Sequence, residues 1–322
     1  MKDFNDKIAV VTGGGTGMGR GLVLQLVEAG CHVATCDVLM DNLDETLSLA
    51  KKANPEVTVT GHTCDVGVED DIKRFAEEVR EQHETEHINL LFNNAGIGGG
   101  GGFVDGPRDQ WERTFAVCWY GVYWSAREFM PMLVASEEGH IINTSSVNGF
   151  WASLGGGISH TAYSAAKFAV KGFSESLITD LRLNAPHVKV SVVMPGHIGT
   201  SIAINSARIL GNAIEPTLSD SDLEQVKQNW IDRGMPVHNF TPDQIRERLR
   251  EVRTQFRDNA PTTADQAATI ILNGVREERW RILVGDDAHR LDEAVRAAPE
   301  EAYEPDFTQR RRLLGSLSSE DE

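Results

Sequence analysis

The chain has 322 residues and a formal net charge of −17, because 48 aspartate and glutamate residues outnumber 31 lysine and arginine residues. This acidic balance argues against nucleic acid and anionic membranes as partners. No apolar run reaches the roughly 18 residues that a membrane-spanning helix needs, and the polar residues 1–7 do not resemble a signal peptide. The four cysteines show no metal-ligand spacing, so we expect a cytoplasmic protein with reduced thiols and no metal site.

Short apolar runs alternate with longer helical patterns along most of the chain. Uninterrupted apolar runs are typical of parallel strands that are covered on both faces. The predicted strands are Ile8–Val11, Val33–Cys36, Val57–Gly61, Ile88–Phe92, Ile141–Asn143, Val188–Met194 and Arg281–Val284. Helical patterns lie between them at Leu22–Ala29, Ile72–Gln82, Ala165–Leu183 and Ala264–Leu272. The alternation predicts a single α/β domain, with a Rossmann-like doubly wound parallel sheet of about seven strands and helices on both faces.

A glycine-rich loop, Thr12 to Gly19, joins the first predicted strand to the first predicted helix. Glycines permit a tight turn there and let backbone amides approach a pyrophosphate at the helix N-terminus. The strict G-x-G-x-x-G pattern is absent, because the spaced glycines are Gly13, Gly17 and Gly19. The place of the loop between a strand and a helix nevertheless favours a dinucleotide site.

Asp37 closes the second predicted strand, where the adenosine ribose of a dinucleotide would lie. A carboxylate there accepts hydrogen bonds from both ribose hydroxyls and repels the 2′-phosphate of NADP. Asp37 therefore predicts NAD rather than NADP as the cofactor, unless it is an ordinary turn aspartate. Arg20 bears on this choice, either as a phosphate neighbour or as a surface charge.

Residues 197–262 depart from the strand–helix rhythm and predict a small helical insertion over the carboxyl edge of the sheet. Two capping-box patterns, Ser221–Glu224 and Thr241–Gln244, indicate where its helices begin. The insertion is either a lid over the substrate or a surface decoration. Residues 305–322 end in a polar, acidic run and are expected to form a flexible tail.

Tyr163 and Lys167 lie four residues apart, which places both side chains on one face of a predicted helix. Ionising a phenol with a pKa near 10 costs about 4 kcal/mol at neutral pH. A lysine charge about 5 Å away, at an effective dielectric constant of about 20, returns roughly 3 kcal/mol. The pair therefore predicts a tyrosine that exchanges protons near neutral pH, although an ordinary amphipathic helix has the same spacing.

Five motifs occur in one order along the chain: Thr12-Gly13-x-x-x-Gly17-x-Gly19, Asn93-Asn94-Ala95-Gly96, Ser146, Tyr163-x-x-x-Lys167, and Pro195-Gly196 with Thr200. In this combination the chain resembles the classical short-chain dehydrogenase/reductase family, over about residues 6–200 and the last strand. The resemblance implies an NAD(H)-dependent oxidoreductase that interconverts a secondary alcohol and a ketone by hydride transfer. It also implies a small-molecule substrate and a homodimer or homotetramer, formed through helices around residues 108–134 and 162–183.

The resemblance assigns roles to individual residues. Tyr163 would be the general acid/base on the substrate oxygen, Lys167 would lower its pKa and bind the nicotinamide ribose, and Ser146 would hold the substrate oxygen. The implied cofactor contacts are Gly13, Thr16, Gly17, Met18, Gly19, Asp37, Asp65, Val66, Asn94, Ala95, Gly96, Tyr163, Lys167, Pro195, Gly196, Ile198 and Thr200. For Asp65, a helix N-cap is the alternative or additional role.

The sequence departs from the family pattern at Cys118, which stands where an asparagine usually completes a catalytic tetrad. In the family, the backbone carbonyl of that residue holds a water in the proton relay to lysine. A backbone carbonyl survives the substitution, so we expect activity with an altered relay. His197 lies beside the cofactor loop, but no carboxylate partner is evident from the sequence.

Two further segments concern the substrate. Phe150, Trp151 and Leu154 lie in an unusually long stretch between Ser146 and Tyr163, and either line an apolar pocket or pack in the core. The former role would indicate a bulky apolar substrate. The five glycines Gly98–Gly102 are costly to order, so we expect this loop to move.

Two other functions stay open. The fold alone does not prove chemistry, so the chain could be a catalytically silent NAD-binding sensor or scaffold. A sugar-nucleotide epimerase or dehydratase of the extended relatives is the third reading, although the glycine spacing fits the classical pattern better.

Overall fold

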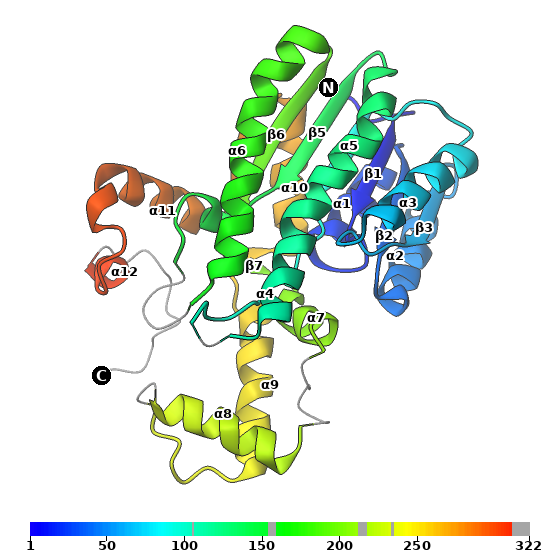
Figure 1. Ribbon diagram of the computed structural model, residues 1–322. Helices are drawn as coiled ribbons and strands as arrows, with labels where there is room; N and C mark the ends of the chain where they lie inside the picture. The colour runs from blue at the N-terminus through cyan, green and yellow to red at the C-terminus, as the bar shows by residue number, and fades with distance from the viewer. Residues whose placement is uncertain (105, 154–158, 212–217, 233–234, 311–322) are drawn as a thin grey trace.

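A parallel sheet of seven strands forms the centre of the computed structural model, which describes residues 1–104, 106–153, 159–211, 218–232 and 235–310. The strand order is β3-β2-β1-β4-β5-β6-β9, and every neighbouring pair is parallel (Figure 1). The strands are β1 Ile8–Thr12, β2 His32–Asp37, β3 Val59–Thr63, β4 Leu90–Asn93, β5 Gly139–Thr144, β6 Val188–Pro195 and β9 Arg281–Val284. This is the predicted doubly wound Rossmann-like fold.

Helices cover both faces of this sheet (Figure 1). The main ones are α1 Gly17–Glu28, α2 Met40–Ala53, α3 Glu69–Gln82, α4 Arg108–Phe115, α5 Gly121–Val134, α6 Thr161–Asn184, α10 Ala264–Arg276 and α11 Asp286–Ala297. Strand β1 explains why the strands read as continuous apolar runs. Val10 packs with α3, α5 and α6 on one face, whereas Ala9 and Val11 pack with α1 and α10 on the other. Both sets of side chains are therefore buried.

The chain changes direction across the sheet at β1, which pairs with β2 on one side and β4 on the other. The carboxyl ends of β1 and β4 consequently face a crevice, the usual ligand position in doubly wound sheets. The glycine loop follows β1 and the Asn93–Gly96 motif follows β4, so the fold places two of the sequence motifs at this crevice.

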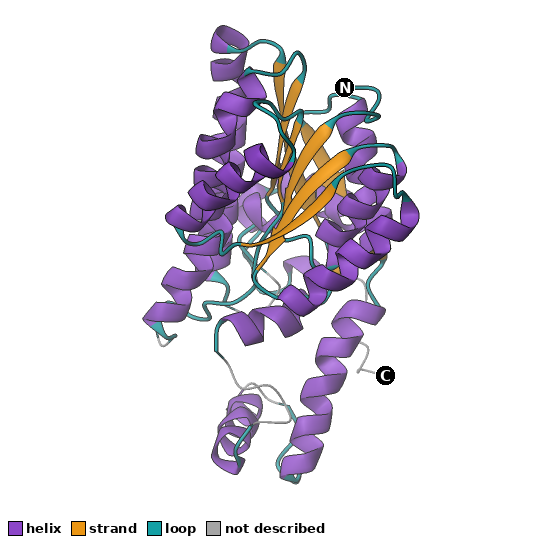
Figure 2. Ribbon diagram, turned by 90° about the vertical axis from the view of Figure 1, so that its right-hand side faces the viewer, coloured by secondary structure: helices purple, strands orange, loops and turns teal. Residues whose placement is uncertain are grey.

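The predicted insertion begins and ends at a second, two-stranded parallel sheet of β7 Ile198–Gly199 and β8 Thr262–Thr263. Between them lie α7 Ile202–Ile209, α8 Asp220–Asp232 and α9 Pro242–Asp258. Helix α7 lies close to the sheet, whereas α8 and α9 form an arm that extends away from it (Figures 1 and 2). The capping box at the start of α9 is confirmed. The other pattern is wrong by two residues, since Ser219 and Asp222 cap each other's backbone where Ser221 and Glu224 were expected to do so.

The chain beyond β9 packs on the loop that follows β5. Phe307, in the short helix α12 Phe307–Arg310, is 1% exposed and lies in one apolar cluster with Trp151 and Leu291. The first residues of the expected flexible tail, 305–310, are therefore partly packed, and residues 311–322 lie outside the described part of the chain. Among the described helices, none is long and apolar enough to cross a membrane.

Candidate active site

The glycine loop folds as a tight turn that ends at the N-terminus of α1. Gly13 and Gly17 have φ values of 70° and 57°, the left-handed region that favours glycine. A Cβ atom on Gly13 would lie 2.8 Å from the Cα atom of Ala95, so a side chain there would collide with the neighbouring motif. The loop therefore lies against Ala95 and leads into the first turn of α1, whose free amides attract anions.

Asn94 fastens this loop to the end of β4. Its Nδ2 atom donates to the carbonyls of Thr12 and Gly13, at 3.1 and 3.3 Å. The Thr12 hydroxyl in turn accepts from the amides of Asn94 and Ala95, each at 3.1 Å. Asn94 therefore supports the shape of the glycine loop through its side chain.

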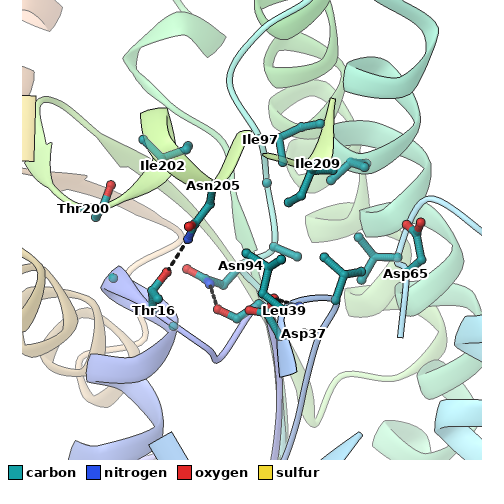
Figure 3. Close-up of a pocket in the computed structure, with 18 of the residues that line it drawn as sticks. Thr16, Asp37, Leu39, Asp65, Asn94, Ile97, Thr200, Ile202, Asn205 and Ile209 are labelled. Atoms are coloured by element: carbon teal, nitrogen blue, oxygen red, sulfur yellow. Dashed lines mark hydrogen bonds between the residues drawn. The ribbon is translucent and has the colours of Figure 1, made fainter. Parts of the chain in front are cut away.

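A pocket opens between the glycine loop, the ends of β2 and β4, and α7, with about 800 Å³ of empty space that is partly open to solvent (Figure 3). The predicted cofactor residues that line it are Gly13, Thr16, Gly17, Met18, Gly19, Asp37, Asp65, Val66, Asn94, Ala95, Gly96 and Thr200. Five predicted cofactor residues do not line this pocket, namely Tyr163, Lys167, Pro195, Gly196 and Ile198. The lining residues that sequence reasoning missed are Val38, Leu39, Cys64, Ile97, Arg113, Val117, Ile202, Asn205 and Ile209. Of these, Val38 and Leu39 could have been found, because they follow Asp37 directly.

The Asp37 carboxylate lies at the edge of this pocket. Its two oxygens accept from the backbone amides of Gly15, at 2.9 Å, and Leu39, at 3.0 Å. Each carboxylate oxygen can accept a further hydrogen bond. The nearby Arg20 is engaged elsewhere, because its guanidinium donates to the Gly15 carbonyl and forms a 2.6 Å ion pair with Glu45.

Asp65 is held by Arg113, the only lysine or arginine among the described residues that line the pocket. The two side chains form an ion pair of 2.6 Å, and the other carboxylate oxygen accepts from the Gly67 amide. The helix N-cap role considered for Asp65 is wrong, since Val68 occupies the N-cap position of α3.

Helix α7 closes one side of the pocket. Asn205 donates to the Thr16 hydroxyl at 3.1 Å (Figure 3). Ser206 accepts from the Gly98 amide at 2.8 Å. The insertion therefore contacts the glycine loop and the Gly98–Gly102 loop together. Three of these five glycines, Gly99 to Gly101, have positive φ values.

Ser146, Tyr163 and Lys167 meet where β5 ends and α6 begins. Ser146 lies in a tight turn, where its hydroxyl accepts from the Asn148 amide at 3.1 Å. Ser146 lies close enough to the Tyr163 phenol to act on its pKa as a side-chain hydrogen-bond partner. The Lys167 ammonium donates to the Thr144 carbonyl at 2.8 Å and lies 5.3 Å from the centroid of the Tyr163 ring. The structure thus brings together all three residues proposed for catalysis.

The predicted lowering of the Tyr163 pKa is wrong in this structure. Burial raises the pKa of the Tyr163 phenol, the neighbouring Cys118 thiol raises it further, and the hydrogen bond with Ser146 opposes the rise. Burial also lowers the pKa of Lys167, which is 2% exposed. Removing both groups from water disfavours the charged form of each, and spacing along a helix does not reveal this cost.

His160, which precedes α6, is a further neighbour of Tyr163. The two rings pack edge to face with centroids 4.6 Å apart. Burial lowers the pKa of His160 to about 4, so this imidazole is neutral at physiological pH. His160 lies three residues before Tyr163 in the sequence, but this spacing alone does not show that the two rings are in contact.

Cys118 lies within a π-helical turn, Ala116–Tyr120, between α4 and α5. Its thiol is fully buried and donates to the Ile97 carbonyl at 3.2 Å. A Cβ atom on Gly96 would lie 3.8 Å from the thiol and 3.6 Å from the Lys167 ammonium. Cys118 is thus close to the lysine, as the family pattern implied.

Residues 147–153, the described first part of the long stretch after Ser146, do not line the pocket. Trp151 is 2% exposed, and its indole donates to the Ala302 carbonyl at 2.7 Å. Phe150 packs against the same C-terminal cluster. Core packing is therefore the correct alternative for Trp151, whereas Phe150 is only partly buried, and Leu154 lies outside the described part of the chain.

His197 has a carboxylate partner that the sequence did not reveal. Its backbone amide donates to Asp287 at 2.7 Å. Its Nε2 atom lies 2.7 Å from the Phe256 carbonyl, and a carbonyl only accepts, so Nε2 carries the proton. This atom cannot act as a catalytic base. In the described residues, no cluster of three histidine, cysteine or acidic side chains could hold a metal ion.

The chain belongs to the short chain dehydrogenase family, whose pattern matches residues 7–209. It is 32% identical over 296 residues to the Mycobacterium tuberculosis protein named "Putative oxidoreductase SadH", with 92% of each chain covered. It is also 34% identical to epidermal retinol dehydrogenase 2 of Mus musculus, over 62% of this chain and 63% of that protein.

Solved structures agree with this membership. A short chain dehydrogenase/reductase from Burkholderia phymatum in complex with NAD shares 27% identity and a TM-score of 0.72, covering 99% of this chain and 100% of that one. A similar metagenomic oxidoreductase was solved with NADP, so nicotinamide cofactors of both kinds occur among similar proteins.

Proposed function

We propose that the protein is an NAD(H)-dependent oxidoreductase that interconverts a secondary alcohol and a ketone. The observation that supports this most directly is the meeting of Ser146, Tyr163 and Lys167 beside a glycine-loop pocket. A scaffold or sensor has no need for a buried lysine next to a serine and a tyrosine at the end of β5. The silent alternative is therefore less well supported.

The nicotinamide ring of a bound cofactor would supply or accept the hydride. During reduction, the Tyr163 phenol donates its proton to the carbonyl oxygen of the substrate. Its raised pKa keeps this proton in place until the substrate binds. Ser146 donates a second hydrogen bond to the same oxygen and stabilises the negative charge that develops there. During oxidation, the tyrosinate takes the proton back from the alcohol.

Lys167 stabilises the tyrosinate that forms when the proton leaves. The Thr144 carbonyl holds its ammonium group at a fixed distance from the phenol ring. A positive charge near a phenolate favours the ionised form. The lysine therefore acts during the reaction, even though burial raises the pKa of the resting phenol.

NAD is the cofactor that the pocket would accommodate better. The Asp37 carboxylate would repel a 2′-phosphate, and the nearest basic side chains are already paired, Arg20 with Glu45 and Arg113 with Asp65. The glycine-loop amides and the N-terminus of α1 would hold the pyrophosphate.

A bulky apolar substrate is proposed on two grounds. Ile97 and Ile209 supply apolar surface to the pocket. In the loop before α4, the ring of Phe103 is 76% exposed and packs edge to face on the ring of Trp111, which belongs to α4. The similarity to a retinol dehydrogenase agrees with an apolar alcohol. Retinol is a primary alcohol, so a substrate panel should contain both primary and secondary alcohols.

We also propose that two copies pair through α5 and α6. Tyr123 on α5 and Phe168 on α6 expose 37% and 42% of their surface, and Tyr120, which ends the π-helical turn before α5, exposes 42%. Light scattering should therefore give the mass of a dimer or tetramer for the wild type and a smaller mass for a Tyr120→Asp, Phe168→Asp variant. A monomeric wild type would contradict the pairing.

The decisive experiment measures turnover of a panel of alcohols and ketones with NAD(H). Tyr163→Phe removes only the hydroxyl and should reduce turnover by about a thousandfold or more while NADH still binds. Tyr120→Phe, an exposed tyrosine outside the site, is the matched control and should behave as wild type. Turnover retained in Tyr163→Phe would refute the mechanism, and a wild type that binds NADH but converts no substrate would support the silent alternative.

A further inference from the structure

We propose that Asp287 is a positioning residue for the nicotinamide end of the cofactor, a role that rests on the proposed function. Asp287 lies in the first turn of α11, 90 residues along the chain from the Pro195–His197 loop. The family resemblance implies that Pro195 and Gly196 lie near the nicotinamide of the cofactor, so we call this segment the nicotinamide loop. The family motif in that loop gives no hint of this carboxylate. Asp287 would act by fixing the loop and would not touch the reacting atoms.

Two hydrogen bonds hold the nicotinamide loop to the β9–α11 connection. The His197 amide donates to Asp287 Oδ2 at 2.7 Å, and the Gly196 amide donates to the Val284 carbonyl at 3.0 Å. A hydrogen bond to a charged acceptor is stronger than one between neutral groups. Asp287 therefore supplies the stronger of the two restraints on this loop.

The backbone on both sides leaves room for the carboxylate. A Cβ atom on Gly196 would lie 2.2 Å from Asp287 Oδ2, and one on Gly285 would lie 2.5 Å from Oδ1. Gly285 also has a φ value of 97°, which disfavours any other residue. Two glycines thus let the carboxylate approach the loop more closely than any side chain would permit.

Burial makes this carboxylate expensive for the fold. Asp287 is 8% exposed, and its Oδ1 atom has no hydrogen-bond partner among the described residues. The N-terminus of α11 offsets part of the cost, because its dipole favours negative charge. The hydrogen bond from the His197 amide to Oδ2 offsets a further part, so the carboxylate and the loop stabilise each other.

The restraint extends into the insertion through His197. The imidazole donates to the Phe256 carbonyl at 2.7 Å, and its ring packs on the Phe256 ring at 4.4 Å. Phe256 belongs to the last turns of α9. Asp287 consequently fixes His197, the residue that joins the nicotinamide loop to the arm formed by α8 and α9.

The test compares the binding of NADH with that of ADP-ribose, which lacks the nicotinamide. In Asp287→Ala, the dissociation constant for NADH should rise about tenfold or more, because a charge-assisted hydrogen bond is lost. ADP-ribose should bind as it does to wild type, since the adenosine half lies at the other end of the site. Asp287→Asn keeps an acceptor for His197 and should restore most of the NADH affinity. Asp286→Ala, an exposed neighbour on the same helix turn, is the control.

Equal weakening of both ligands would show a merely structural role and overturn the proposal, as would unchanged NADH binding in Asp287→Ala. If Asp287→Ala does not fold, Asp287→Glu is measured in its place, because the longer side chain displaces the carboxylate and should also weaken NADH alone. Substrate turnover of the wild type is followed in parallel. A wild type without turnover counts against the proposed function. The role of Asp287 is tested separately, by the ratio of the dissociation constants for NADH and ADP-ribose.

Discussion

The thiol of Cys118 donates a hydrogen bond to the Ile97 carbonyl at 3.2 Å, and both residues lie beside the site that Lys167 occupies. Cys118 belongs to a π-helical turn in which the Gly121 amide reaches back to the Ala116 carbonyl. The turn is therefore held by backbone bonds that do not involve the thiol. The Cys118 side chain fills space at the junction of α4 and α5, while the backbone hydrogen bonds set the shape of the turn.

Cys118→Ala should consequently retain turnover to within about threefold of wild type, while losing stability because a buried atom is removed. Steady-state kinetics and denaturant unfolding measure the two effects separately. Cys31→Ala, which removes another fully buried thiol far from the site, is the matched control for stability. A hundredfold loss of turnover in Cys118→Ala alone would mean that the thiol itself takes part in proton transfer.

Asp37 should determine the choice of cofactor. Asp37→Ala removes the acceptor for the ribose hydroxyls and the charge that repels a 2′-phosphate, so KM for NAD⁺ should rise about tenfold and KM for NADP⁺ should fall. Initial rates with each cofactor at a fixed substrate concentration measure the ratio. Asp41→Ala, an exposed carboxylate near the same edge of the sheet, should leave the ratio unchanged. An unchanged ratio in Asp37→Ala would contradict the ribose assignment.

His140 should make the fold sensitive to mild acid. It is 1% exposed, its Nε2 atom lies 2.7 Å from the Ser191 hydroxyl, and its Nδ1 atom has no partner among the described residues. Burial lowers its pKa to about 3. The unfolded chain binds this proton near pH 6.5, so the stability that neutral His140 contributes is complete above about pH 6.5 and is lost progressively toward pH 3.

Denaturant unfolding at several pH values tests this dependence. His140→Gln keeps a donor for Ser191 but does not titrate, so its free energy of unfolding should fall by about 2 kcal/mol less than that of wild type between about pH 6.5 and 5. His83 and His160, whose pKa values are each lowered to about 4, remain in both proteins and act as an internal control. Parallel pH profiles for the two proteins would contradict the role of His140.

The sequence predicted the sheet well because its signal is local. Strands buried on two faces must be apolar at consecutive positions, as in β1, and the residues that follow such strands must meet at one edge. The same logic placed the glycine loop at the crevice, whereas the family resemblance supplied Asn94 and Ser146. Tyr163 and Lys167, two of the three residues proposed for catalysis, were found because they share one helix face.

Contacts between distant segments had no such signal. Asn205 reaches Thr16 and Asp287 reaches His197 across 189 and 90 residues, and nothing in the neighbouring sequence identifies either partner. Trp151 could not be assigned to the core or to a pocket, because its partners come from the C-terminal segment. The Tyr163 pKa depended on burial, which spacing along a helix does not specify.

Phe307 should matter for stability although it lies in a segment that the sequence presents as a tail. Its ring is 1% exposed and lies 6.3 Å from the ring of Trp151, centroid to centroid. Truncation of a buried phenylalanine leaves a cavity, so Phe307→Ala should lower the free energy of unfolding by about 3–5 kcal/mol. Leu183→Ala makes a similar truncation at a side chain that is 77% exposed and should cost less than about 0.5 kcal/mol.

Trp151 follows the turn that holds Ser146, so KM for the substrate should also rise in Phe307→Ala while NADH binding is preserved. Equal stability of the two variants in urea unfolding would show that the C-terminal segment does not pack on this loop in solution.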